Sequence, residues 1–211
     1  KAKRKTQKKK RKRKHRKEGM KHRGVAAGVL YALALVFEDQ HRVLDDGTPS
    51  APLTYLLPAL LRVLDAPAAT PLADSACLYA LQCVHYALGD YGPCVAAQSG
   101  ALLPRCCRHA AGTGSVRVRQ AACQCVCALV LRAEAAVAPA MDDLVRFFLA
   151  ALGSGVPDEV CVEACRFWRV ACHSDALQAK VAPALPQLLP LLLARMVFSS
   201  DEIAALRADE Q

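Results

Sequence analysis

The chain has 211 residues, of which 54% are hydrophobic but only 5% are aromatic. Ala, Leu and Val therefore supply most of the apolar surface, which favours helices packed on helices over a β-sandwich core. The net charge of +9 is unevenly divided, because residues 1–23 hold fifteen Lys or Arg against one acid, while the remainder holds 13 bases and 18 acids. The basic character thus belongs to one end, and the body is mildly acidic.

Residues 1–23 form a low-complexity segment, whose densest basic run is Lys8, Lys9, Lys10, Arg11, Lys12, Arg13 and Lys14. Like charges at this density repel one another, so we predict that the segment is disordered. Three interpretations stay open: a nuclear localisation or nucleic-acid patch, since clustered Lys and Arg displace counterions from phosphate, a solvated tail without a dedicated partner, or a misassigned exon or start site. The first residue is Lys1 rather than Met, so we expect a fragment of a longer protein.

From Gly24 onward, apolar residues recur at the spacing of one helix face, and no alternating strand pattern competes with them. Glycines and prolines separate the apolar runs, as Gly153, Gly155 and Pro157 do. The pattern predicts helices near residues 25–39, 52–65, 72–89, 93–110, 116–133, 138–152, 158–173 and 177–197.

The predicted helices repeat in pairs. One series of apolar pairs begins 42, 42 and 44 residues apart, at Leu60, Leu102, Leu144 and Leu188. A second series, an Ala-Cys pair on the other helix, begins 46 and 42 residues apart, at Ala76, Ala122 and Ala164. A two-helix period in the low forties is typical of HEAT repeats, whereas an irregular helical bundle needs no period. We therefore predict an all-α HEAT-repeat solenoid of about three and a half helix pairs over residues 24–205, followed by a stub at 206–211.

The eleven cysteines lie in apolar helical stretches, where free Cys acts as a small buried hydrophobe. Cys123, Cys125 and Cys127 alternate on a helix, so the middle thiol points away from the outer two, and no C-x-x-C pair occurs. We expect no disulfide, no metal and no cofactor, and we predict that Cys123 and Cys165 are buried at equivalent positions between repeats.

No arrangement typical of an enzyme is found. The residues His173, Ser174 and Asp175 are adjacent in sequence, which is the wrong geometry for a hydrolase triad. They instead predict the start of a helix, with Asp175 as the N-cap and Gln178 completing a capping box. No membrane span is expected, because the apolar stretch 25–37 is short and the stretch 181–198 is interrupted by three prolines.

Two stretches near the end resemble a known family. The first stretch is Glu163-Ala-Cys-Arg-Phe-Trp168. The second is Leu185-Pro-Gln-Leu-Leu-Pro-Leu-Leu-Leu-Ala-Arg-Met196, followed by Phe198-Ser199. Both stretches resemble the transportin-like receptors of the importin-β family. The resemblance covers about residues 24–203, in the N-terminal half of such receptors. It implies a nuclear import receptor that binds Ran GTPase, nucleoporins and cargo proteins and is found in the cytoplasm, in the nucleus and at the nuclear pore. It also implies that the main cargo groove lies outside this chain.

The polar residues on the second helix of each pair are the candidate binding residues, because that helix lines the concave surface of such solenoids. They include Arg117, Gln120 and Gln124 in one repeat and Glu159, Glu163 and Arg166 in the next. The resemblance adds Asp201 and Glu202, at the start of an acidic loop. The alternative is a solvated wall with intrahelical ion pairs such as Glu163–Arg166.

Two other classes of function remain open. The chain could be a HEAT-repeat scaffold or regulatory subunit of another complex, such as a phosphatase or a chromatin assembly. It could also be a nucleic-acid-binding protein that acts through its basic segment. A transcript continuing into a long Asp/Glu-rich loop and more repeats would favour the receptor over the scaffold.

Overall fold

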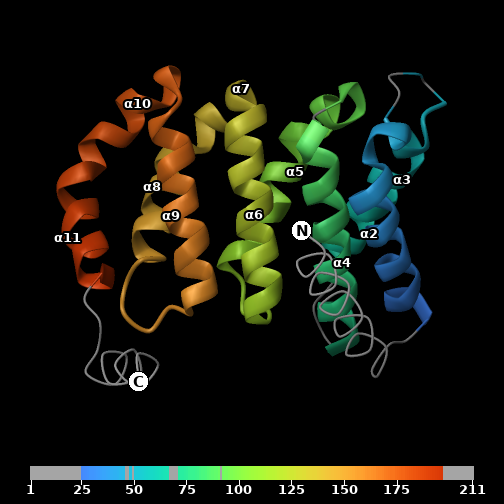
Figure 1. Ribbon diagram of the computed structural model, residues 1–211, viewed down its shortest axis with the longest axis horizontal. Helices are drawn as coiled ribbons and strands as arrows, with labels where there is room; N and C mark the ends of the chain where they lie inside the picture. The colour runs from blue at the N-terminus through green and yellow to red at the C-terminus, as the bar shows by residue number, and fades with distance from the viewer. Residues whose placement is uncertain (1–24, 46–47, 49, 67–70, 91, 197–211) are drawn as a thin grey trace, which may run out of the picture. The chain divides into compact units, whose positions relative to one another are not determined.

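The computed structural model describes residues 25–45, 48, 50–66, 71–90 and 92–196, and within these ranges all regular secondary structure is helical (Figure 1). Residues 1–24 and 197–211 lie outside the described residues, and with them the basic segment, Asp201 and Glu202. The helices are α2 (Val25–Leu44), α3 (Pro52–Asp65), α4 (Pro71–Asp90), α5 (Pro93–Ala111), α6 (Val116–Arg132), α7 (Glu134–Val137), α8 (Met141–Ala150), α9 (Asp158–Cys172), α10 (Asp175–Val181) and α11 (Leu185–Met196), with 3₁₀ turns η1 (Ala138–Ala140) and η2 (Ala182–Ala184).

The chain divides into two compact units, the first ending at Ala97 and the second beginning at Gln98. In the first unit, α2 packs along α4, and α3 packs on α4. The buried face of α3 is made by leucines at helical spacing, Leu53, Leu57, Leu60, Leu61 and Leu64. Between α2 and α4, the rings of Tyr31 and Tyr79 meet edge to face at 5.2 Å. Each helix thus buries one apolar stripe.

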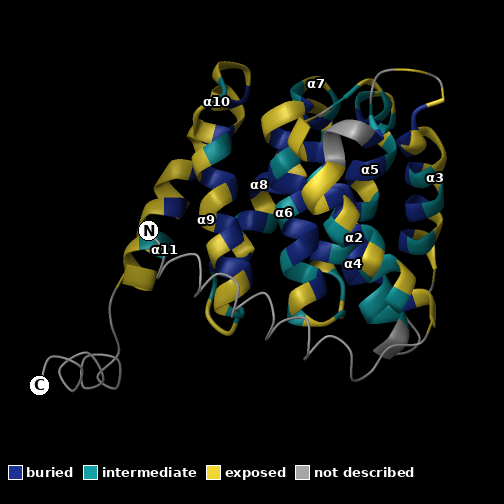
Figure 2. Cartoon of the chain, turned by 45° about the vertical axis from the view of Figure 1, so that its right-hand side comes forward, coloured by how far each residue is buried: buried dark blue, intermediate teal, exposed yellow. Residues whose placement is uncertain are grey.

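In the second unit, α6 and α9 lie side by side, and α8 packs against α9, α10 and α11. The ring of Phe148 on α8 stacks on that of Phe167 on α9, with centroids 4.1 Å apart. Both rings are fully buried, as are Leu129 and Met141. Figure 2 colours the buried stretches of these helices dark blue and the exposed stretches yellow. Helices that pack on their neighbours in chain order confirm the predicted all-α solenoid.

A short internal repeat fixes the phase of the second unit. The residues Val-Ala-Pro-Ala occur at 137–140 and again at 181–184, which is 44 residues later. At both places the chain forms a 3₁₀ turn between a short helix and a longer one, with proline near its start. Proline lacks a backbone N–H, so it is tolerated in the first turn of a helix. Segments α7–η1–α8 and α10–η2–α11 are therefore the same structural element in successive repeats.

The helices depart from the predicted ones at several places, and the predicted helix 177–197 is observed as α10 and α11 with the 3₁₀ turn η2 between them. Helix α2 continues past residue 39 to Leu44, through a kink at Gln40 where the backbone is not helical. The predicted helix 138–152 is preceded by α7, which begins at Glu134. Helix α10 is capped by Ser174, whose side chain accepts a hydrogen bond from the backbone N–H of Leu177, so the expectation that Asp175 is the cap was wrong.

All eleven cysteines are free thiols. Cys123 is fully buried, as predicted, but Cys165 is exposed, so the prediction for that residue was wrong. Both occupy the same position in the repeat. On α6, this position faces α9, which covers it. Within the described residues no following second helix packs along α9 in the same way, so the equivalent position on α9 stays exposed.

Among the described residues, the segment Asp175–Met196 is long and apolar enough to cross a membrane by length and composition alone. The bent pair α6 and α7–α8 meets the same test only if it is counted as one span. Only 22% of the apolar window in Asp175–Met196 is buried, with Leu177, Val181 and Leu188 among its buried side chains. That the protein has no membrane span stays a prediction.

Candidate partner-binding surface

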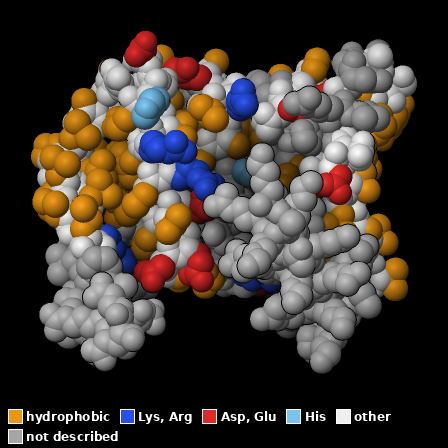
Figure 3. Space-filling model, in the orientation of Figure 1, with side chains coloured by type: hydrophobic (Ala, Val, Ile, Leu, Met, Phe, Trp, Pro, Cys, Tyr) orange, Lys and Arg blue, Asp and Glu red, His pale blue; other side chains and the backbone are white. Residues whose placement is uncertain are grey.

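The second helices α6 and α9 present a shared polar surface in the second unit, which we call the second-helix face. Its outward residues are Arg117, Gln120 and Gln124 on α6 and Glu159, Arg166 and Arg169 on α9. Figure 3 shows basic side chains gathered over this side of the second unit, with acidic ones below them. Helix α9 begins with Asp158 and Glu159 and carries Arg169 in its last turn, so the charge changes sign along the helix in the direction that stabilises its dipole.

Glu163 does not lie on the exposed stripe where its sequence spacing places it. Its exposed fraction is 1%, because α6 covers this turn of α9. The carboxylate has a charged or polar neighbour on each side, although Oε2 accepts no hydrogen bond and has only an ion pair. Gln124 Nε2 donates a hydrogen bond of 2.8 Å to Oε1, and the Arg166 guanidinium lies 3.0 Å from Oε2. A buried carboxylate without such partners would be strongly unfavourable. Together with Cys127, whose thiol donates to the Glu163 carbonyl oxygen at 3.6 Å, these residues form the Glu163 cluster.

The predicted Glu163–Arg166 ion pair is therefore present, but it is not an ion pair on a solvated wall. The Arg166 side chain is 43% exposed while that of Glu163 is 2% exposed, so the buried carboxylate holds a guanidinium that still reaches solvent. The planar guanidinium carries five N–H donors, and one carboxylate leaves several of them free for another acceptor. The exposed guanidinium thus keeps N–H donors of the kind that bind a carboxylate or phosphate.

The thiols of Cys123 and Cys127, which lie near the Glu163 cluster, are protonated and unreactive. Burial, with a smaller contribution from the Glu163 charge, raises the pKa of Cys123 to about 12. The same two causes raise the pKa of Cys127 well above its usual value. Both thiols stay protonated at neutral pH, so neither is a nucleophile or a thiolate ligand. Within the described part of the chain, no group of three or more His, Cys, Asp or Glu is placed to hold a metal ion.

The structure brings some of the predicted site residues together and leaves others apart. Arg166 and Glu163 touch, whereas Glu159 is exposed one turn earlier on α9. Near the other end of α9, the His173 ring Nδ1 lies 2.6 Å from the Arg169 carbonyl oxygen. Gln124 was predicted as a candidate binding residue on the concave surface, but its contact with Glu163 was not predicted, because 39 residues separate the two in the chain.

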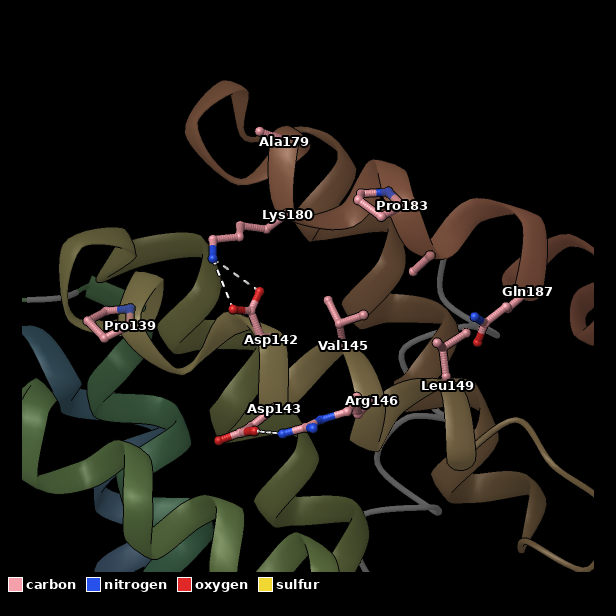
Figure 4. A pocket seen from close by; sticks show the side chains of 11 residues that line it. Pro139, Asp142, Asp143, Val145, Arg146, Leu149, Ala179, Lys180, Pro183 and Gln187 are labelled. Atoms are coloured by element: carbon pink, nitrogen blue, oxygen red, sulfur yellow. Dashed lines mark hydrogen bonds and ion pairs between the residues drawn. The ribbon is translucent and has the colours of Figure 1, made fainter.

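A second surface, which the sequence analysis missed, is the groove between α8 and α10–α11. It has a volume of about 810 Å³ (Figure 4). Val145, Leu149 and Ala184 form an apolar floor, and two pairs of oppositely charged side chains lie along its edges. Lys180 Nζ lies 3.0 Å from an Asp142 carboxylate oxygen, and Arg146 pairs with Asp143. The repeated Val-Ala-Pro-Ala was the available signal, because its two prolines, Pro139 and Pro183, line the groove.

Comparison with known proteins finds no matching family model. The chain is similar to importin subunit beta-2 of Schizosaccharomyces pombe, with 25% identity over 183 residues that make up 86% of this chain and 19% of that protein. The chain thus spans about a fifth of the length of this relative. The similarity supports a distant relationship to the importin-β family and agrees with the helical repeats of the structure.

Proposed function

We propose that this chain is part of a nuclear import receptor of the importin-β type, which acts by binding other proteins and not by catalysis. The observation that carries the proposal is the similarity to importin subunit beta-2 along 86% of the chain. The stacked helix pairs support it, because solenoids of this kind offer long surfaces for partner proteins. On this proposal the protein moves between cytoplasm and nucleus through the nuclear pore.

The partner proposed for the second-helix face is Ran GTPase. Arg166 would contact an acidic group of Ran, and Glu159 a basic one, since both are exposed on the same helix. Glu163 acts as a positioning residue, because it is buried and reaches a partner only through Arg166. Asp201 and Glu202 complete the proposed contact. Cargo proteins would bind in the part of the receptor that this chain does not cover.

The groove between α8 and α10–α11 is the surface proposed for nucleoporins. The resemblance implies weak contacts with Phe-Gly segments, and a phenylalanine ring needs an apolar floor such as Val145 and Leu149 provide. The groove is distinct from the second-helix face, so the two partners would not compete for the same residues.

The test is a titration of the purified chain with Ran loaded with a non-hydrolysable GTP analogue. We expect saturable binding in the micromolar range, because this chain would hold only part of the contact surface and a few enclosed contacts carry most of the affinity. Glu159→Lys and Arg166→Glu should each weaken binding several-fold. The matched control is Arg62→Glu, an exposed arginine on α3 of the other unit.

Binding that is unchanged in both charge reversals would refute the site. No binding of Ran at all would refute the partner and favour the alternative of a HEAT-repeat scaffold in another complex. Tight binding of a cargo signal peptide would refute the assignment of cargo to a region outside this chain.

A second candidate function rests on the basic segment, which carries fifteen Lys or Arg in 23 residues and no aromatic residue to stack on bases. We expect it to bind duplex DNA without sequence preference, and binding should fall steeply with added salt. If a chain lacking residues 1–23 binds DNA equally well, or if salt has no effect, this function is excluded.

A further inference from the structure

The two second helices of the second unit keep the same repeat positions open. The open positions are Arg117, Gln120, Gln124 and Ala128 on α6 and, 42 residues later, Glu159, Val162, Arg166 and Val170 on α9, which we call the α6 stripe and the α9 stripe. Each set follows the three- and four-residue spacing of one helix face. The α6 stripe stays accessible although α9 packs along that helix, since Arg117 is exposed and the other three residues are half-buried. A following repeat therefore does not cover these positions, and the α9 stripe is open to a partner.

The α9 stripe places a basic side chain between two apolar ones. Val162, Arg166 and Val170 lie at successive turns; Val162 is 58% exposed and Val170 is half-buried. Four residues of an α-helix rise about 6 Å. Two residues of an extended chain span about 6.7 Å, and their side chains point to the same side. An extended segment laid along α9 therefore brings alternate side chains over these three residues.

A polar group for the main chain of such a segment lies beside the arginine. Gln124 and Arg166 occupy equivalent positions on α6 and α9, which run side by side (Figure 1), and both contact the buried Glu163 carboxylate, at 2.8 and 3.0 Å. A carboxamide has two N–H groups and one oxygen, so the bond to Glu163 leaves Gln124 with a donor and an acceptor. These match the C=O and the N–H of a peptide backbone. The Glu163 cluster thus presents one group for a side chain and one for the main chain.

The charge of this region favours an acidic ligand. Arg166 and Arg169 lie within one turn of each other on α9, against the single carboxylate of Glu163, and α6 contains no acidic residue. Figure 3 shows basic side chains gathered on this side of the second unit. A segment with an acidic residue between its apolar ones complements this charge, whereas a basic residue at that place would be repelled.

We propose that the α9 stripe binds an extended segment of a partner protein with the pattern apolar–x–acidic–x–apolar. The acidic side chain pairs with Arg166, the apolar side chains pack on Val162 and Val170, and the backbone between them hydrogen-bonds to Gln124. The pattern is the same in both chain directions, so either direction of the segment fits. The inference rests on the proposed function in using this face as a partner surface, and it specifies what the partner presents there.

Fluorescence anisotropy with a labelled peptide tests the proposal on the full chain. The probe is Gly-Leu-Ser-Asp-Ser-Leu-Gly with fluorescein at its N-terminus and an amide at its C-terminus. We expect saturable binding with a Kd on the order of 10⁻⁴ M, because a short flexible peptide loses conformational freedom for few contacts. Asn in place of Asp in the peptide should weaken binding about tenfold, since a hydrogen bond to a charged group is replaced by a neutral one.

A rearranged peptide is the control for charge alone. Gly-Ser-Asp-Leu-Leu-Ser-Gly has the same composition and charge, but its acid no longer alternates with the two leucines. Any attraction of an anionic peptide to the basic segment 1–23 would act on both peptides equally. We expect the rearranged peptide to bind several-fold more weakly than the probe.

Three chain variants locate the binding. Arg166→Glu should abolish binding of the probe and allow binding of the same peptide with Lys in place of Asp, whereas Val162→Asp should weaken binding of the probe several-fold. The matched control is Arg146→Glu, at an exposed arginine on α8 in the groove, which should leave binding unchanged. Circular dichroism establishes that each variant is folded, and the peptide pair decides the question if one is not.

Equal binding of the two peptides of the same composition overturns the proposal. Binding that is lost in Arg146→Glu and kept in Arg166→Glu also overturns it, because the peptide would then lie in the groove. Peptide binding without Ran binding supports the inference and refutes only Ran as the partner. Ran binding without peptide binding overturns the inference and leaves the proposed function intact.

Discussion

Replacing the buried carboxylate of Glu163 tests whether the Glu163 cluster holds α6 and α9 together. Glu163→Ala removes the acceptor of the 2.8 Å hydrogen bond from Gln124, and a hydrogen bond to a charged group contributes about 1.5–3 kcal/mol. It also removes the ion pair with Arg166, which contributes at most about 1 kcal/mol because the arginine side chain is 43% exposed. Relief from burying the carboxylate opposes both losses. We expect a net loss of about 2 kcal/mol in the free energy of unfolding.

Glu163→Gln keeps an oxygen that accepts from Gln124, so it should cost about 1 kcal/mol or less. The matched control is Glu159→Ala, an exposed residue one turn earlier on the same helix, which should stay within about 0.5 kcal/mol of wild type. The assay is urea unfolding followed by the fluorescence of Trp168, the only tryptophan, which is 3% exposed on α9 and reports on the second unit. An unchanged midpoint for Glu163→Ala, or equal losses for Ala and Gln, would refute the hydrogen bond as the source of stability.

Three further outcomes are expected from the same unit. Phe148→Ala removes a fully buried ring that stacks on α9 at 4.1 Å, and it should cost about 3–5 kcal/mol in the same fluorescence assay. Cys123→Asp should destabilise the unit strongly because it buries a charge, whereas Cys165→Asp at the exposed equivalent position should be neutral in urea unfolding. The pKa of Cys123 is raised to about 12 in the folded chain, so its contribution to stability is complete below the usual thiol pKa. That contribution is lost as the pH rises toward 12, so urea midpoints should fall between pH 8 and pH 10.5, and less so in Cys123→Ala.

The sequence alone determined the helices and their repeat. The four leucines that set the period, Leu60, Leu102, Leu144 and Leu188, are all buried, with exposed fractions of 3% or less. This was predictable because an amphipathic helix is specified by residues three and four positions apart, which lie close in the chain. The cap of α6 is also local, since the Ser115 side chain accepts a hydrogen bond from the backbone N–H of Val118, although this cap was not predicted.

Only the tertiary structure decided which polar residues of these helices remain accessible. Glu159 and Glu163 lie one turn apart on α9, yet the first is exposed and the second is buried, because α6 crosses only the second. Cys123 and Cys165 share one position in the repeat, yet only Cys123 has a following helix packed against it. The groove likewise combines side chains of α8 with those of α10 and α11, from successive repeats. The burial of a side chain depends on which distant helix reaches it, and the spacing within one helix carries no information about that neighbour.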